Sequence, residues 1–221
     1  MIKTDIKERY IEAIKDIRST LLGPLHVNLV AFLANEGVPT YLRRWALPGS
    51  NFMTDIRSDF QRILTGLDKA IEVHPADPWL RVMRGRALTA LGYFMAAIQD
   101  LDAALGADSA ERCLFLAEAY FEQAKGTFND PLAYYTSAAL YATKSIRFHT
   151  KEHNSPRPYL VRAQCDAHIL KLCGYHHKTA LFHDKYRDIE ADLRAARDVS
   201  GEAEITRIAK NIRSLLGVEE S

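Results

Sequence analysis

The side chains best suited to chemistry lie close together in one C-terminal stretch. Two cysteine–histidine pairs have the same internal spacing, Cys165-x-x-His168 and Cys173-x-x-His176. Residues three apart share one face of a helix, so either pair has the spacing to hold a zinc ion through sulfur and imidazole nitrogen. Because Gly174 is expected to end that helix, all four ligands meet only if the chain turns back tightly. We favour packed cysteines beside exposed histidines. A metal- or small-ligand-binding helical protein that uses these four residues stays as the alternative.

Motifs of familiar enzyme classes are missing from the sequence. It contains no glycine-rich phosphate loop, no GxSxG elbow and no HExxH zinc motif. Asp184 and Asp188 share a helix face at a spacing of four, which is typical of a solvated stripe, and Asp100 and Asp102 point to different sides. We therefore expect a protein that is not an enzyme and that needs no cofactor or metal.

Composition describes an ordinary globular chain. The protein has 221 residues, a formal net charge of +1 and three cysteines. Its longest apolar runs, such as Leu29 to Ala34, are too short to cross a bilayer, and the N-terminus lacks the apolar core of a signal peptide. An odd number of cysteines without a repeating pattern fits a reducing compartment. We expect a cytoplasmic protein with no membrane partner.

Charge is distributed unevenly along the chain. Met95 to Asp130 holds seven acidic and two basic residues, whereas Lys144 to Asp188 holds nine basic and four acidic residues. The basic half suits phosphate or an acidic partner. Few aromatic residues alternate with its bases in the way that single-stranded nucleic acid needs, so we do not expect nucleic-acid binding. A homo-oligomer, with the acidic middle of one molecule against the basic half of another, is a further hypothesis.

Helical periodicity predicts an all-α fold. Apolar residues recur at spacings of three and four over most of the chain, and no segment alternates with the period of a strand. The turn cluster at residues 48–51 separates two predicted domains, an N-terminal helical segment over residues 1–53 and a helical repeat domain over residues 54–221. We expect the second domain to begin with a helix at Thr54 to Val73.

An internal repeat is visible in the second domain. The string LDKAI begins at Leu67 and LDAAL begins at Leu101, an offset of 34 residues. The stretch from Arg84 to Leu105 has the features of a helix–turn–helix unit. These are small Gly85 with Leu88, turn residue Gly92 followed by aromatic Phe94, and the small–large–small row Ala97, Leu101 and Ala104. Before this stretch, Pro75 closes the preceding unit.

This stretch resembles the tetratricopeptide repeat, a helix–turn–helix unit of the same length. The resemblance implies an α-solenoid of antiparallel helix pairs with about three irregular repeats. The second repeat would use a first helix around Leu116 to Tyr120 and a partner near Ala138 to Ile146, and the third would pair Tyr159 to Leu172 with Ile189 to Val199. Insertions, GTFNDPLAYY and GYHHKTALFHDKY, lie between the helices of each. Glu202 to Leu216 would cap the stack.

The resemblance also implies a binding site, because the first helices of such repeats line a concave groove. The expected function is that of a non-enzymatic adaptor that binds a peptide or helix of another protein. Lysine and asparagine clamps for a terminal carboxylate, which some members have, are not expected, because Val82 and Arg86 occupy the matching positions. The expected binding residues are Trp79, Val82, Met83, Arg86, Phe115, Glu118, Phe121, Glu122, Gln164, His168 and Lys171.

Overall fold

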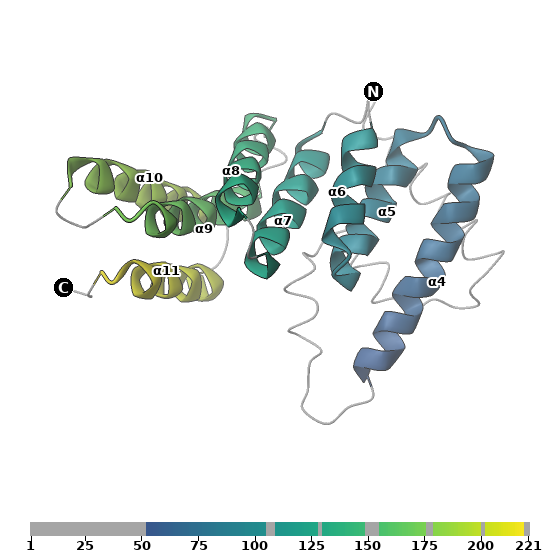
Figure 1. Cartoon of the computed structure of the whole chain (residues 1–221), viewed down its shortest axis with the longest axis horizontal. Coiled ribbons are helices and arrows are strands. Elements are labelled where there is room, and N and C mark those ends of the chain that lie inside the picture. Colours follow the sequence, from purple (N-terminus) through teal and green to yellow (C-terminus); the bar gives the residue numbers. More distant parts are fainter. Residues whose placement is uncertain are drawn as a thin grey trace. The chain divides into compact units, whose positions relative to one another are not determined.

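The computed structural model describes residues 52–104, 109–127, 130–148, 155–175, 179–199 and 202–218. All regular secondary structure in these ranges is α-helical, which confirms the predicted all-α class (Figure 1). The predicted N-terminal helical segment lies outside the described residues, apart from the first residues of α4. The helices are α4 (Phe52–Val73), α5 (Pro78–Leu91), α6 (Phe94–Ala103), α7 (Ala110–Gly126), α8 (Pro131–Arg147), α9 (Arg157–Leu172), α10 (Ala180–Arg197) and α11 (Glu202–Leu216).

The chain divides into two compact units, Met1–Tyr93 and Phe94–Ser221. In its described part the first unit holds α4 and α5, and the second unit holds α6 to α11. The boundary falls between the two helices of the clearest predicted repeat.

In the first unit, α4 packs against α5. The Asp77 side chain accepts a hydrogen bond from the Trp79 amide (2.9 Å) and starts α5, with Pro78 in its first turn. At the other end Gly92 has φ +85°, and the amide of Tyr93 donates to the Leu88 carbonyl (2.9 Å). This is the left-handed ending that glycine allows. The prediction that Gly92 ends a helix is confirmed.

In the second unit, each helix from α6 to α10 packs against the next, and neighbours run antiparallel (Figure 1). Two further contacts skip a neighbour in the sequence. α7 touches α9 directly, and α11 packs against both α9 and α10. The helices predicted around residues 116–120, 138–146, 159–172 and 189–199 all exist.

The predicted starts of two helices are wrong. α8 begins at Pro131 rather than near Ala138, and α10 begins at Ala180 rather than Ile189. In both cases most of the presumed insertion is helix. The reason is local capping, because Asp130 accepts from the amide of Ala133 (3.2 Å), and a threonine, Thr179, caps α10 in the same way.

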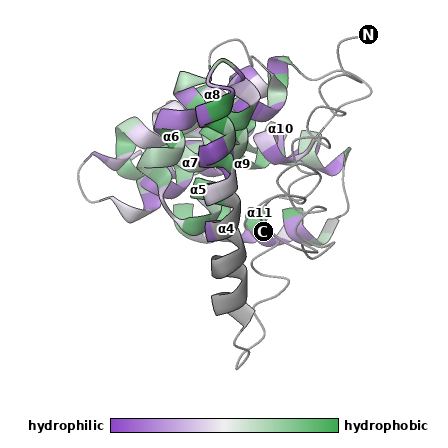
Figure 2. Ribbon diagram, turned by 90° about the vertical axis from the view of Figure 1, so that its right-hand side faces the viewer, coloured by the Kyte–Doolittle hydropathy of each residue, from purple (hydrophilic) through white to green (hydrophobic). Residues whose placement is uncertain are grey.

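Most of the buried residues are apolar, and Figure 2 shows hydrophobic and hydrophilic residues alternating along the ribbons. On α8 the buried stripe is made of small residues, Ala138, Ala142 and Ser145, all fully buried. The Ser145 hydroxyl donates to the Ala110 carbonyl of α7 (2.7 Å), which small neighbours make possible. Among the helices that the structure describes, none combines the length and apolar content that crossing a lipid bilayer requires.

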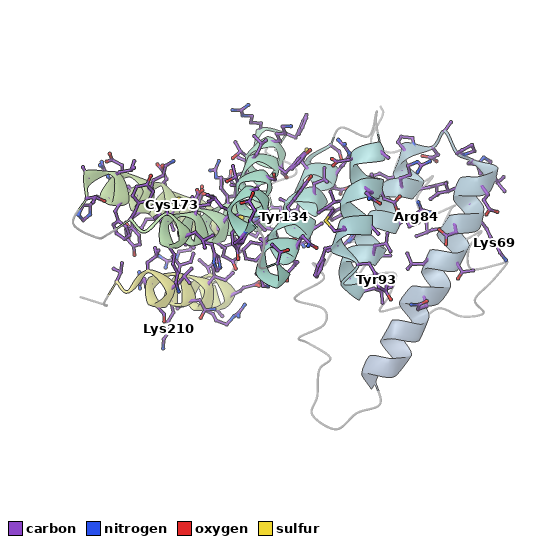
Figure 3. All side chains as sticks on the ribbon, in the orientation of Figure 1. Lys69, Arg84, Tyr93, Tyr134, Cys173 and Lys210 are labelled. Atoms are coloured by element: carbon purple, nitrogen blue, oxygen red, sulfur yellow. The ribbon has the colours of Figure 1, made fainter. Side chains whose placement is uncertain are left out.

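The helix predicted over Glu202 to Leu216 has those bounds in the structure, as α11. Its residues Ile205, Ile208 and Ile212 are buried in a core that α9 and α10 share. Burial of an aliphatic side chain of this size is worth roughly 1.5–3 kcal/mol. The opposite side of α11 is polar, and Lys210, labelled in Figure 3, is exposed there.

Candidate functional site

Four of the predicted binding residues lie on α5, and three of them are buried. Val82, Met83 and Arg86 expose 0%, 5% and 6% of their surface, and Trp79 is partly buried. Buried side chains offer little surface to a partner, so these three contribute mainly to packing. A charge reversal at Arg86 would disturb the interior of the protein before it tested a groove.

In the second unit, α7 and α9 bring several predicted residues together. The rings of Phe121 on α7 and His168 on α9 meet edge to face, with centroids 6.1 Å apart and planes at 65°. Glu122 follows Phe121 in sequence, and Lys171 lies one helical turn after His168. We call this surface the α7–α9 face. It comprises Phe121, Glu122, Lys125, Tyr135, His168 and Lys171.

Tyr135 of α8 is a central member of this face that our sequence-based set lacks. The His168 imidazole lies flat on its ring, with centroids 4.5 Å apart and planes 5° apart. Phe121 lies 5.8 Å from the same ring. A sequence signal exists for it, because Tyr135 stands three residues before Ala138 and extends the buried stripe of α8. Tyr135 ends the segment GTFNDPLAYY, which we interpret from the sequence as an insertion, so it is not among the predicted binding residues.

The charged groups on α7 are held in place by their neighbours. The Lys125 ammonium contacts both carboxylate oxygens of Glu122, at 2.8 and 2.7 Å, and lies 5.1 Å from the centre of the Phe121 ring. The lysine and glutamate side chains are 46% and 27% exposed. A pair this exposed contributes little to stability. Its effect is to position one positive and one negative group at the edge of the aromatic cluster.

His168 is partly buried among these groups. Burial lowers the pKa of its imidazole, and the nearby charges of Lys171 and Lys125 lower that pKa further. The ring is therefore mainly neutral at pH 7. Lys171 is exposed, and no carboxylate in the described part of the chain forms an ion pair with it. The face thus presents a neutral imidazole with the ammonium groups of Lys125 and Lys171 nearby.

The remaining predicted residues of α7 and α9 have partners within the protein. Glu118 forms an ion pair with Arg157 at the start of α9 and is only 11% exposed in its side chain. The Gln164 amide donates to the Leu160 carbonyl of its own helix (3.1 Å). Phe115 is buried, with 6% of its surface exposed. These three residues stabilise the helices around the face.

The cysteine–histidine pairs are spread over different environments. Cys165 is fully buried in the core between α7, α8 and α9, and this burial raises the pKa of its thiol well above the usual value. Cys173 is exposed, and His168 is stacked on Tyr135. His176 lies outside the described residues. Within the described ranges, no group of three or more histidine, cysteine, aspartate or glutamate residues is arranged to hold a metal ion.

A second cluster of polar aromatic residues joins α6, α7 and α8. The Asp102 carboxylate accepts hydrogen bonds from the hydroxyls of Tyr141 (3.2 Å) and Tyr120 (3.4 Å), whose rings stack 5.6 Å apart. The Tyr134 ring lies beside Tyr120 (Figure 3 labels Tyr134 on α8). Burial, with Asp102 adding to it, raises the pKa of Tyr120 to about 12. These hydroxyls stay protonated at neutral pH, which suits a structural link between helices.

The charges of the acidic middle region are partly neutralised inside the second unit. Glu118 pairs with Arg157, Glu122 pairs with Lys125, and Asp102 accepts two hydroxyl hydrogen bonds. Fewer acidic groups are therefore available to another molecule than the sequence suggests. Self-assembly through opposite charges stays a prediction.

Comparison with known proteins gives no match. No family model, no curated protein and no solved structure matches this chain. The function is therefore inferred from the packing of α7, α8 and α9 and from the groups that these helices present.

Proposed function

We propose that this chain is a non-enzymatic interaction module of tetratricopeptide-like type. It binds a peptide or helical segment of another protein on the α7–α9 face. The observation that carries the proposal is the meeting of Phe121, Glu122, His168 and Lys171 in one connected cluster of rings and charges. These four residues are among those that the resemblance to the tetratricopeptide repeat implies for binding.

The packing order supports the repeat part of the proposal. α7 and α9 are the first helices of consecutive antiparallel pairs, and they touch each other directly. First helices that touch in this way line a continuous surface in repeat proteins. The second helices also share a pattern, because buried residues recur at spacings of four and three in α6, α8 and α10. They are Ala97, Leu101 and, directly after the end of α6, Ala104; Ala138, Ala142 and Ser145; and Ile189, Leu193 and Ala196.

The chemistry of the face supports the binding part. Phe121 and Tyr135 are buried, and their ring contacts fix the orientation of the His168 imidazole. Half-buried Glu122 and exposed Lys125 and Lys171 lie beside these rings. Rigid aromatic groups with a polar rim are typical of surfaces at which a few residues supply most of the binding energy. Because the rings are already ordered, binding needs little additional loss of side-chain entropy.

Selection from a display library of random peptides tests the proposal without knowledge of the partner. The full chain is the bait, and enriched peptides are then measured against two charge reversals. Lys171→Glu lies on the face, and Lys210→Glu is the matched control on the exposed side of α11. We expect binding to weaken about tenfold with the first variant and to stay unchanged with the second. The proposal is wrong if no peptide is enriched, or if both variants bind like the wild type.

A further inference from the structure

We infer that the partner segment is acidic, and that its carboxylate lies between Lys171 and His168 with uptake of a proton by His168. This inference deepens the function proposed above and rests on it. It concerns the chemical class of the ligand and the way in which pH controls its binding.

The charges on the α7–α9 face leave one lysine without a carboxylate in the described part of the chain. Glu122 already neutralises Lys125, whereas Lys171 has no carboxylate partner in the described part of the chain. Lys171 and the outward edge of His168 are one helical turn apart on α9, so one carboxylate can reach both. Glu118, the other acidic residue of this side of α7, is occupied by Arg157. The surface therefore complements an anionic group.

Groups from three helices act on His168. They are Lys125 from α7, the ring of Tyr135 from α8 and Lys171 from α9, whereas Glu122 acts on Lys125 and Tyr135. The two lysines disfavour the charged imidazolium. No described charge of α10 or α11 is among the groups that act on it. A carboxylate placed beside Lys171 would offset the lysine charges and favour the imidazolium.

Binding of the carboxylate and protonation of His168 affect each other reciprocally. If the bound carboxylate raises the pKa of His168, then protonation of His168 must tighten the binding of the carboxylate. Each unit of that change corresponds to about tenfold in affinity. The gain appears as the pH falls through the pKa of His168 in the complex, and glutamate and aspartate side chains of a peptide are still mainly ionised near neutral pH.

The experiment uses the full chain and the same random twelve-residue display library, selected at pH 6. The enriched peptides are synthesised, and their affinities are measured from pH 7.5 to 5.5 by fluorescence anisotropy. We expect aspartate and glutamate to dominate the enriched sequences, and affinity to rise about tenfold as the pH falls. Replacement of the key acidic residue by its amide should remove most of the binding.

Two variants test whether His168 is the group that takes up a proton when the peptide binds. His168→Gln removes the titrating ring and should remove the gain at low pH, whereas His183→Gln, at an exposed position of α10, should retain it. NMR titration of the His168 ring in the wild type should show a higher pKa when the peptide is bound, and this measurement does not depend on the stability of any variant.

The possible failures are distinguishable. Neutral or basic peptides that still depend on Lys171 would overturn the inference and leave the proposed function intact. Acidic peptides whose pH dependence persists in His168→Gln, or whose binding leaves the His168 titration unchanged, would overturn the role of the proton. Absence of any enriched peptide would overturn the proposed function itself.

Discussion

Arg162 on α9 holds the buried carboxylate of Asp192 on α10 through two parallel hydrogen bonds. The Nε–Oδ2 and Nη2–Oδ1 distances are 2.8 and 2.6 Å. Its third nitrogen, Nη1, donates to the hydroxyl of Thr143 on α8 (3.2 Å). This planar fork is a geometry that lysine cannot reproduce. One side chain thus connects three consecutive helices of the second unit.

Removal of this arginine should destabilise the protein clearly. The Asp192 side chain is 7% exposed, so in Arg162→Leu its charge would stay buried without compensation. We expect a loss of about 2–3 kcal/mol in the free energy of unfolding, measured with urea. Arg187→Leu is the matched control, because Arg187 pairs with Asp184 on the surface of α10. That variant should lose about 0.5 kcal/mol or less. Equal losses in the two variants would contradict this account.

Asp166, one turn after Arg162 on α9, should make the stability depend on pH. Burial raises the pKa of Asp166 to about 6, with Asp192 and Asp188 adding to the effect and Lys185 and Arg162 opposing it. At Asp166 the folded protein therefore binds more protons than the unfolded chain between about pH 4 and 6. The contribution of this group to stability falls as the pH rises through this window.

Replacement of Asp166 by its neutral amide tests whether its contribution to stability falls as the pH rises. Asp166→Asn should be more stable than the wild type by about 2 kcal/mol at pH 7.5, and the difference should disappear near pH 4. Urea unfolding at several pH values gives both numbers. Asp198→Asn, at an exposed position after α10, should leave the pH dependence unchanged. A difference that does not vary with pH would show that Asp166 is not the titrating group.

Tyr120 should titrate at unusually high pH, because burial and the carboxylate of Asp102 both disfavour its phenolate. The difference in absorbance at alkaline pH between the wild type and Tyr120→Phe isolates this one tyrosine. Its pKa should lie near 12 in the wild type. In an Asp102→Asn background the same difference should appear at lower pH, because a neutral amide does not repel the phenolate. An unchanged titration in that background would show that Asp102 does not raise the pKa of Tyr120.

The features that could be predicted from the sequence are those that one helix encodes by itself. The stripe of isoleucines gave the bounds of α11, and Gly92 gave the end of α5. The start of α8 was also encoded locally, by Asp130 followed by Pro131, but this cap lay in a stretch that we interpreted as an insertion.

The features that could not be predicted depend on pairs of helices. Arg157 with Glu118, and Arg162 with Asp192, join residues that are 39 and 30 positions apart. The stack of His168 on Tyr135 likewise needs the register between α8 and α9. The periodicity of a single helix indicates which side is buried and says nothing about which residue of the neighbouring helix lies opposite.

Replacement of Gly92 by alanine gives a last prediction. The position has room for a side chain, but its backbone conformation is unfavourable for any residue other than glycine. A Cβ added there would meet nothing within 4 Å, yet φ is +85°, a conformation that alanine rarely adopts. Gly92→Ala should therefore lose about 1–2 kcal/mol in the free energy of unfolding through backbone strain alone. Gly126, the last residue of α7, has equal room and no positive φ. Gly126→Ala should be neutral or gain about 0.5 kcal/mol from reduced freedom of the unfolded chain. If the two alanine variants change the free energy of unfolding in urea by the same amount, the left-handed backbone at Gly92 does not strain an alanine there.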